Sequence, residues 1–174
     1  RDKPSLGCAG RALNQLCRSE GNVAAGKAKR NTFRHGPCRG VAECAAAEAA
    51  IGPLRLATAE QAASIADPVV RARALHVVGE NQRVRTCAAA LAAGDLSTAG
   101  RLMVESHASL RDLYGCSTAA MDVAVETLCA TPGVYGARMT GGGFGGCVVA
   151  LTEPAALTTG WVVRPVCGAR LIAG

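Results

Sequence analysis

Aromatic residues are scarce in this chain of 174 residues, at 3% of the total, whereas hydrophobic residues make up 49%. Charged residues are also few, at 18%, so the chain can bury a core and intrinsic disorder is not expected. With few large rings available, the core must be built from Ala, Val and Leu. We therefore expect closely packed helices and a modest stability.

No apolar run approaches the ~18 residues of a membrane span, and no apolar segment of a secretory signal follows Arg1. We expect a cytoplasmic protein without a membrane partner. The nine cysteines are odd in number and include no Cys-x-x-Cys pair, which favours free thiols over a disulfide framework. His35 and Cys38 come nearest to a ligand pair, but without a second pair we expect no metal site.

The net charge of +6 is spread along the chain, with small groups of basic residues at 27–30 and 71–85. Binding to a phosphate backbone needs clustered positive charge, usually with a recognisable module or stacking aromatics. Neither is present, so no nucleic-acid partner is expected. A basic sugar or nucleotide site would account for the charge equally well.

The helical part of the chain begins after residues 1–36, which glycines interrupt and which lack a sustained period. A first helix is predicted from Cys38 to Ile51. Asp67 and Pro68 predict the start of a second helix, which Gly94 ends and whose apolar face includes Val77 and Val84.

Two further helices and a small sheet are predicted towards the C-terminus. Asp95 and Ser117 are the expected N-caps of these helices. Strands are predicted at 134–140, 147–151 and 161–163. Helices followed by a small sheet indicate an α+β domain.

Five glycines occupy the six positions from Gly141 to Gly146, between two predicted strands. Gly141, Gly143 and Gly146 satisfy the spacing G-x-G-x-x-G of dinucleotide-binding folds. That fingerprint needs a helix directly after the glycines and an acidic residue about twenty positions later. Residues 147–151 favour a strand and no such acidic residue follows, so a dinucleotide-binding fold is not expected.

The glycine content of this segment favours a ligand-binding loop. A simple hairpin needs about two turn residues, and further glycines add an entropic cost. Backbone N–H groups that carry no side chain can approach a ligand closely or form an anion-binding nest. The alternative interpretation is a tight turn.

The segment from Val134 to Cys147, Val-Tyr-Gly-Ala-Arg-Met-Thr-Gly-Gly-Gly-Phe-Gly-Gly-Cys, resembles the third conserved motif of galactokinases, members of the GHMP small-molecule kinase superfamily. Residues 76–84 resemble the family's His-Val-Val-x-Glu-Asn helix, and residues 106–114 resemble its Ser-His-x-Ser-Leu stretch. Residues 161–169 resemble its terminal strand and turn. The resemblance implies a GHMP kinase C-terminal domain of the α+β class, with helices packed on a small antiparallel, ferredoxin-like sheet.

The resemblance also implies a reaction, the ATP-dependent phosphorylation of D-galactose to galactose 1-phosphate, with Mg²⁺ on the nucleotide. The loop that would border the sugar and the transferred phosphate consists of Thr140, Gly141, Gly142, Gly143, Phe144, Gly145 and Gly146. If a small gap is allowed, Asp2 matches the family's proposed catalytic base; the alternative is a solvated carboxylate near the chain start. His76 and His107 are expected to be structural.

Some family features are missing from this chain. The family's galactose motif and Ser-rich ATP phosphate loop lie upstream of Arg1, so we expect the isolated chain to be inactive. On this interpretation residues 1–36 are a remnant of the N-terminal kinase domain, or disordered, and residues 37–174 are the C-terminal domain. Residues 31–36 resemble the stretch that leads to a sugar-contacting Tyr, which is absent here.

The segment from Pro154 to Gly160 is shorter than the helix that the family has there, which predicts an incomplete domain with one sheet face uncovered. The alternative function is a non-catalytic sugar-binding or regulatory remnant of a galactokinase. The sequence leaves open whether the sugar is galactose or an analogue such as an amino sugar. It also leaves the oligomeric state open.

Overall fold

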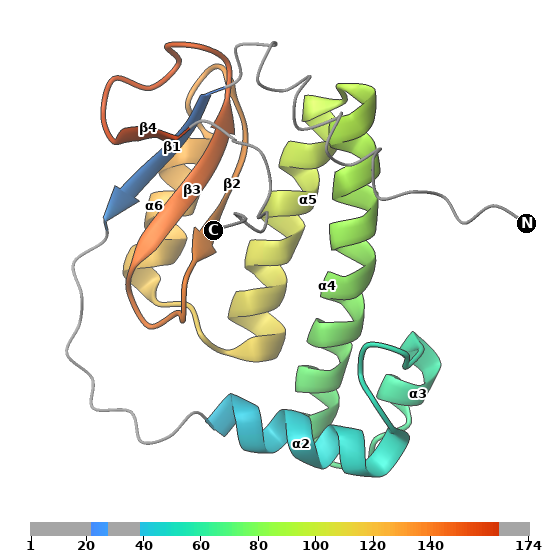
Figure 1. The fold of residues 1–174 in the computed structure, drawn as a ribbon. Coiled ribbons are helices and arrows are strands. Elements are labelled where there is room, and N and C mark those ends of the chain that lie inside the picture. The colour runs from blue at the N-terminus through green and yellow to red at the C-terminus, as the bar shows by residue number, and fades with distance from the viewer. Residues whose placement is uncertain (1–21, 28–38, 164–174) are drawn as a thin grey trace, which may run out of the picture.

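A computed structural model describes residues 22–27 and 39–163, which form a group of helices and one antiparallel sheet (Figure 1). The helices are α2 (Arg39–Ile51), α3 (Ala59–Ala63), α4 (Pro68–Ala93), α5 (Leu96–Ser109) and α6 (Ala119–Cys129), and a π-helical segment, η1 (Leu110–Tyr114), follows α5 directly. The strands are β1 (Asn22–Lys27), β2 (Val134–Thr140), β3 (Cys147–Thr152) and β4 (Trp161–Val163). Among the helices, α5 and α6 pack against the sheet, and α2 and α3 pack against α4. The predicted α+β class is confirmed.

Short polar side chains cap four of the helices, and Thr58 is the N-cap of α3. Asp67 accepts hydrogen bonds from two backbone N–H groups at the start of α4, and Asp95 accepts one at the start of α5, as predicted. The predicted cap of α6 is wrong by one residue. Thr118 is the N-cap because its backbone is extended and its hydroxyl accepts from Met121, whereas the Ser117 hydroxyl donates to Asp122 over 2.6 Å.

Strand β1 was not predicted, because no element was expected before Cys38. The strand order is β2-β3-β1-β4, so β1 lies inside the sheet and pairs with β3 from Asn22↔Thr152 to Lys27↔Cys147. This short segment gives no local signal, since a strand of this kind is fixed by its neighbours in the sheet. The proposed division of the chain at residues 36 and 37 remains a prediction, although β1 belongs to the same sheet as β2, β3 and β4.

Helix α5 runs along the edge of the sheet beside β2, with α4 on its other side (Figure 1). The contact with β2 depends on two glycines. A Cβ atom on Gly136 would lie 2.0 Å from the carbonyl oxygen of Gly100, and one on Gly100 would lie 2.2 Å from that of Tyr135. Only glycine permits this backbone approach. The helix therefore holds β2 in place and shields its unpaired edge.

Ala, Val and Leu make up most of the buried hydrophobic residues, as predicted, but Met121 and Met139 are among the largest fully buried side chains. The cluster between α6 and the sheet consists of Cys116, Met121, Val125, Ala137, Met139, Val148 and Ala150. A second cluster around Ala74 joins α2 and α3 to the first half of α4, and Val77 packs against it. Val84 was expected on the same buried face but is 64% exposed, because α2 and α3 do not extend that far along α4.

The connection between β3 and β4 contains no helix, which agrees with its predicted shortening. Trp161, Val162 and Val163 of β4 are each about half exposed. Across the described ranges, no helix combines the length and apolar character that crossing a membrane requires.

Candidate functional site

The Gly loop, defined as residues 141–146, connects two strands that remain paired up to its base. Thr140 at the end of β2 is opposite Cys147 at the start of β3. The loop thus spans six residues at one end of the hairpin (Figure 1), where a two-residue turn would suffice to reverse the chain. Its length requires an explanation other than chain reversal.

The backbone of the Gly loop has positive φ at every residue except Gly142. The values are 90° at Gly141, 81° at Gly143, 56° at Phe144, 105° at Gly145 and 142° at Gly146. Four of the five glycines thus adopt a φ angle that other residues rarely adopt. Phe144 also adopts a left-handed conformation, which is uncommon for a bulky residue and which the surrounding contacts must maintain.

The glycines differ in what a side chain would meet. A Cβ atom on Gly143 would lie 2.5 Å from the carbonyl oxygen of Cys116, so Gly143 is packed against the protein. Gly141 and Gly142 face open space, because a Cβ atom on either residue would have no neighbouring atom within 4 Å. Gly142 thus needs to be glycine neither for its φ angle nor for internal packing. A ligand that approaches the backbone from outside would supply the missing reason.

The middle of the loop is anchored to the segment between α5 and α6. The N–H of Phe144 donates to the carbonyl oxygen of Cys116 over 2.8 Å, and the N–H of Cys116 donates to the carbonyl of Leu110 over 3.1 Å. Burial raises the pKa of the Cys116 thiol, which keeps it protonated at neutral pH. Cys116 therefore contributes an anchoring carbonyl and not a nucleophile.

A charged network lies behind β2. The Glu80 carboxylate accepts hydrogen bonds from Arg83 over 2.5 Å, from the Ser106 hydroxyl over 2.7 Å and from Arg138 over 3.4 Å. Burial alone raises the pKa of Glu80, but the hydrogen bonds from Ser106 and Arg83 and the two guanidinium charges outweigh it and lower that pKa. The network ties α4 and α5 to Arg138, two residues before Thr140.

His107 connects α5 to the same strand. The residue is 3% exposed. Its Nδ1 accepts the backbone N–H of Met139 over 3.3 Å, and its Nε2 lies 3.1 Å from the Asp122 carboxylate. Burial lowers the pKa of His107, although Asp122 opposes this effect. His76 is likewise buried, and its Nδ1 lies 2.8 Å from the Ser109 hydroxyl. Both histidines are packed and hydrogen-bonded, in keeping with the predicted structural role.

The structure does not describe every residue that the sequence analysis considered. Asp2 and the pair His35 and Cys38 fall outside the described residues, so their roles stay predictions. Within the described part of the chain, no group of three or more His, Cys, Asp or Glu side chains is arranged to hold a metal ion. The anchor at Cys116 and the acceptor role of Asp122 were missed, because no spacing in the sequence relates either residue to the loop.

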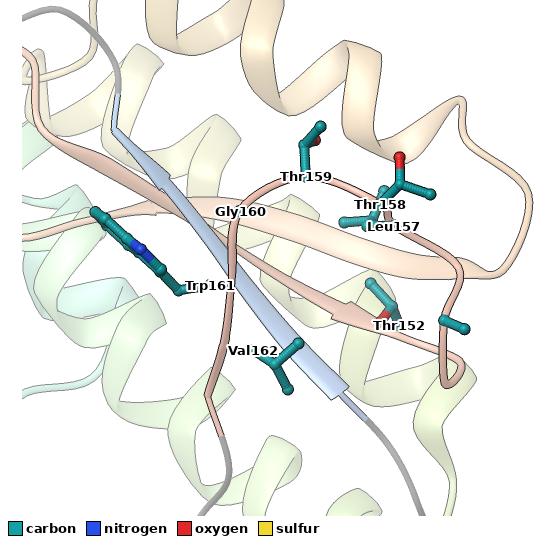
Figure 2. A pocket seen from close by; sticks show the side chains of 8 residues that line it. Thr152, Leu157, Thr158, Thr159, Gly160, Trp161 and Val162 are labelled. Carbon is teal, nitrogen blue, oxygen red and sulfur yellow. The ribbon is translucent and has the colours of Figure 1, made fainter.

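A cleft of about 110 Å³ lies at the other end of β3, between Thr152 and the connection to β4 (Figure 2). Leu157 and Thr158 line it, and the indole of Trp161 extends away from them. The Gly loop precedes Cys147, at the opposite end of the strand. This cleft is therefore separate from the candidate site.

Residues 87–158, which include the Gly loop, match the family model of the GHMP kinases C terminal. The galactokinase of Bos taurus is 61% identical over 84 residues, covering 48% of this chain and 21% of that protein. The galactokinase of Roseiflexus sp. is 56% identical over 90 residues, covering 52% of this chain and 23% of that protein. The chain thus spans about a fifth of the length of these curated relatives.

The fold is also similar to a solved structure, that of Lactococcus lactis galactokinase complexed with galactose. The TM-score is 0.66 at 33% sequence identity, and the match covers 77% of this chain and 38% of that protein. The similarity therefore extends over most of the chain. The expected resemblance to galactokinases is confirmed.

Proposed function

We propose that this chain, which carries a GHMP kinase C-terminal domain similar to that of galactokinases, forms one wall of a sugar kinase site for D-galactose and ATP. The reaction is transfer of the γ-phosphoryl group to the anomeric hydroxyl, which gives galactose 1-phosphate. The chain spans about a fifth of the length of its curated relatives. The proposal therefore concerns only the side of the site that the Gly loop forms. The nucleotide loop would come from the part of the kinase that precedes the matched region.

The observation that carries this proposal is the surface of Gly141 and Gly142. Both glycines face open space. At Gly142 neither a positive φ angle nor a neighbouring protein atom requires a glycine. A backbone without β-carbons lets N–H groups reach within hydrogen-bond distance of a sugar oxygen or a phosphate. The galactose complex of the Lactococcus lactis relative supports a sugar as the ligand class.

Phosphoryl transfer depends on positioning and on electrostatic stabilisation more than on covalent chemistry by the protein. In our proposal the backbone of the Gly loop orients the acceptor and the transferred phosphate, and the exposed Thr140 borders the same space. Mg²⁺ would accompany the ATP phosphates. Asp2 would orient or deprotonate the anomeric hydroxyl.

A chimera tests the proposal. Residues 22–163 replace the structurally corresponding part of the Lactococcus lactis galactokinase, and galactose-dependent formation of ADP is measured. The matched control carries Asn-Gly in place of residues 141–146, which keeps a hairpin but removes the loop. We expect turnover in the first chimera and none in the control. Urea unfolding of both proteins should show that each is folded.

Calorimetry on the same chimera with galactose and with Mg-ATP separates the proposal from its alternative. If the chain forms one side of a sugar kinase site, the chimera should bind both galactose and Mg-ATP and convert them to products. Galactose binding without turnover would favour a non-catalytic sugar-binding remnant. A folded chimera that binds neither ligand would show that the Gly loop does not belong to a sugar kinase site.

A further inference from the structure

A chain of hydrogen bonds joins the two sides of the Gly loop through residues outside it. On the β2 side, the N–H of Met139 donates to Nδ1 of His107. On the other side, the N–H of Phe144 donates to the carbonyl of Cys116. Asp122 links these two contacts, because one of its oxygens lies 3.1 Å from Nε2 of His107 and 2.6 Å from the hydroxyl of Ser117, the neighbour of Cys116.

These contacts determine which nitrogen of the neutral His107 ring carries the proton. A backbone N–H can only donate, so Nδ1 must carry a lone pair, and the ring proton of the neutral imidazole is on Nε2, facing Asp122. Protonation at Nδ1 would place two donors opposite each other and break the bond to Met139. The strand end that leads into the Gly loop would then lose one of its supports.

We propose that His107 is a positioning residue, whose neutral imidazole, held by Asp122, sets the conformation of the Gly loop and releases it when the ring becomes protonated. This inference rests on the proposed function only where it implies that the loop conformation affects sugar binding. The effect of His107 on the loop conformation is independent of any ligand. The switch makes the loop responsive to acidification.

The charges around His107 are consistent with a neutral ring at physiological pH. Burial disfavours the imidazolium most strongly, and Asp122 of α6 favours it. Arg111 of η1 and Arg138 of β2 add repulsion to a positive ring. Together these groups lower the pKa of His107, so release of the loop is expected on the acidic side of the ordinary histidine range.

Two substitutions separate the two bonds of the ring. His107→Asn places an amide oxygen near the position of Nδ1, so it keeps an acceptor for Met139 and loses the bond to Asp122. His107→Gln places an amide nitrogen near Nε2, so it keeps the bond to Asp122 and loses the acceptor. His76→Gln is the control, because His76 is also a buried histidine but its Nδ1 contacts Ser109 and not Met139 or Asp122.

Amide hydrogen exchange and NMR shifts of the complete 174-residue chain, without ligand, provide the test. We expect the Met139 amide to exchange about fivefold faster in His107→Gln than in His107→Asn or His76→Gln, as loss of one hydrogen bond implies. The shifts of Gly142 and Gly145 should titrate with the His107 ring in the unmodified chain and in His76→Gln, and stay flat in both His107 variants.

Equal Met139 exchange in His107→Gln and His76→Gln would overturn the proposal. If His107→Gln does not fold, the unmodified chain decides alone: loop amides that do not follow the titration of the His107 ring contradict it. Galactose turnover of the chimera is measured separately. A loop that responds to His107 in a chimera without turnover leaves the positioning role intact and refutes the sugar kinase site.

Discussion

The carbonyl oxygen of Cys116 accepts the N–H of Phe144 over 2.8 Å, and a Cβ atom on Gly143 would lie 2.5 Å from the same oxygen. One backbone atom thus both holds the Gly loop and limits the size of the residue beside it. The loop consequently has two parts. Gly143 is packed against Cys116, whereas Gly141 and Gly142 face outward.

Alanine substitutions should therefore destabilise the chain in a fixed order. Gly143→Ala combines a clash with Cys116 and a positive φ, and we expect a loss of about 2–3 kcal/mol in the free energy of unfolding. Gly141→Ala meets only the positive φ and should cost about 1 kcal/mol. Urea unfolding at pH 7.5 measures both. Equal losses at the two positions would mean that Gly143 is not held against Cys116.

A loop that binds a ligand through its glycines predicts that Ala at Gly143 or Gly145 impairs turnover more than folding. The structure changes this expectation for Gly143, since the clash lies inside the protein. Gly142 replaces it as the position at which function can be tested without strain.

The network behind β2 should contribute to stability. Glu80→Gln removes the charge that Arg83 and Arg138 share in a half-buried setting, and we expect a loss of about 2–3 kcal/mol in the free energy of unfolding. Glu105→Gln is the control, because Glu105 pairs with Arg101 at the exposed surface and should cost less than about 0.5 kcal/mol. Similar effects of the two substitutions would show that the Glu80 network is no stronger than a surface pair.

Stability should fall on mild acidification. Burial lowers the pKa of both His76 and His107 in the folded chain, so the unfolded chain binds more protons as the pH decreases towards 6.5 and below. The free energy of unfolding then decreases with falling pH until the pH passes the folded-state pKa values. Urea unfolding between pH 8 and 5 measures this slope, and His76→Gln together with His107→Asn should flatten it. An unchanged slope in the double variant would assign the pH dependence to other groups.

The regular elements that were predicted have local causes. Asp67 with Pro68, and Asp95 after Gly94, specify helix boundaries through bonds within one turn, and the structure contains them. Strand β1 depends instead on pairing with β3, which is distant in the sequence, and so gave no signal.

The candidate site shows the same division between local and distant causes. The dense glycines marked the loop itself, because a positive φ is a local requirement. Its supports could not be found in this way. Cys116 contacts the loop at Phe144, and Asp122 contacts His107, only because the chain folds so that α5, α6 and β2 pack together. The matched motif residues Glu80 and Ser106 proved to be partners of one another, which their separation in the sequence did not reveal.

Turnover of Gly142→Ala tests the central claim most directly. In the chimera with residues 22–163, a methyl group at this position meets no protein atom within 4 Å and no positive φ, so the free energy of unfolding should stay within about 0.5 kcal/mol. If the backbone of the loop lies against sugar or phosphate, turnover of galactose should fall by at least about tenfold, equivalent to ~1.4 kcal/mol of transition-state stabilisation. Full turnover per folded molecule in Gly142→Ala would contradict the account and reduce the Gly loop to a connection between two strands.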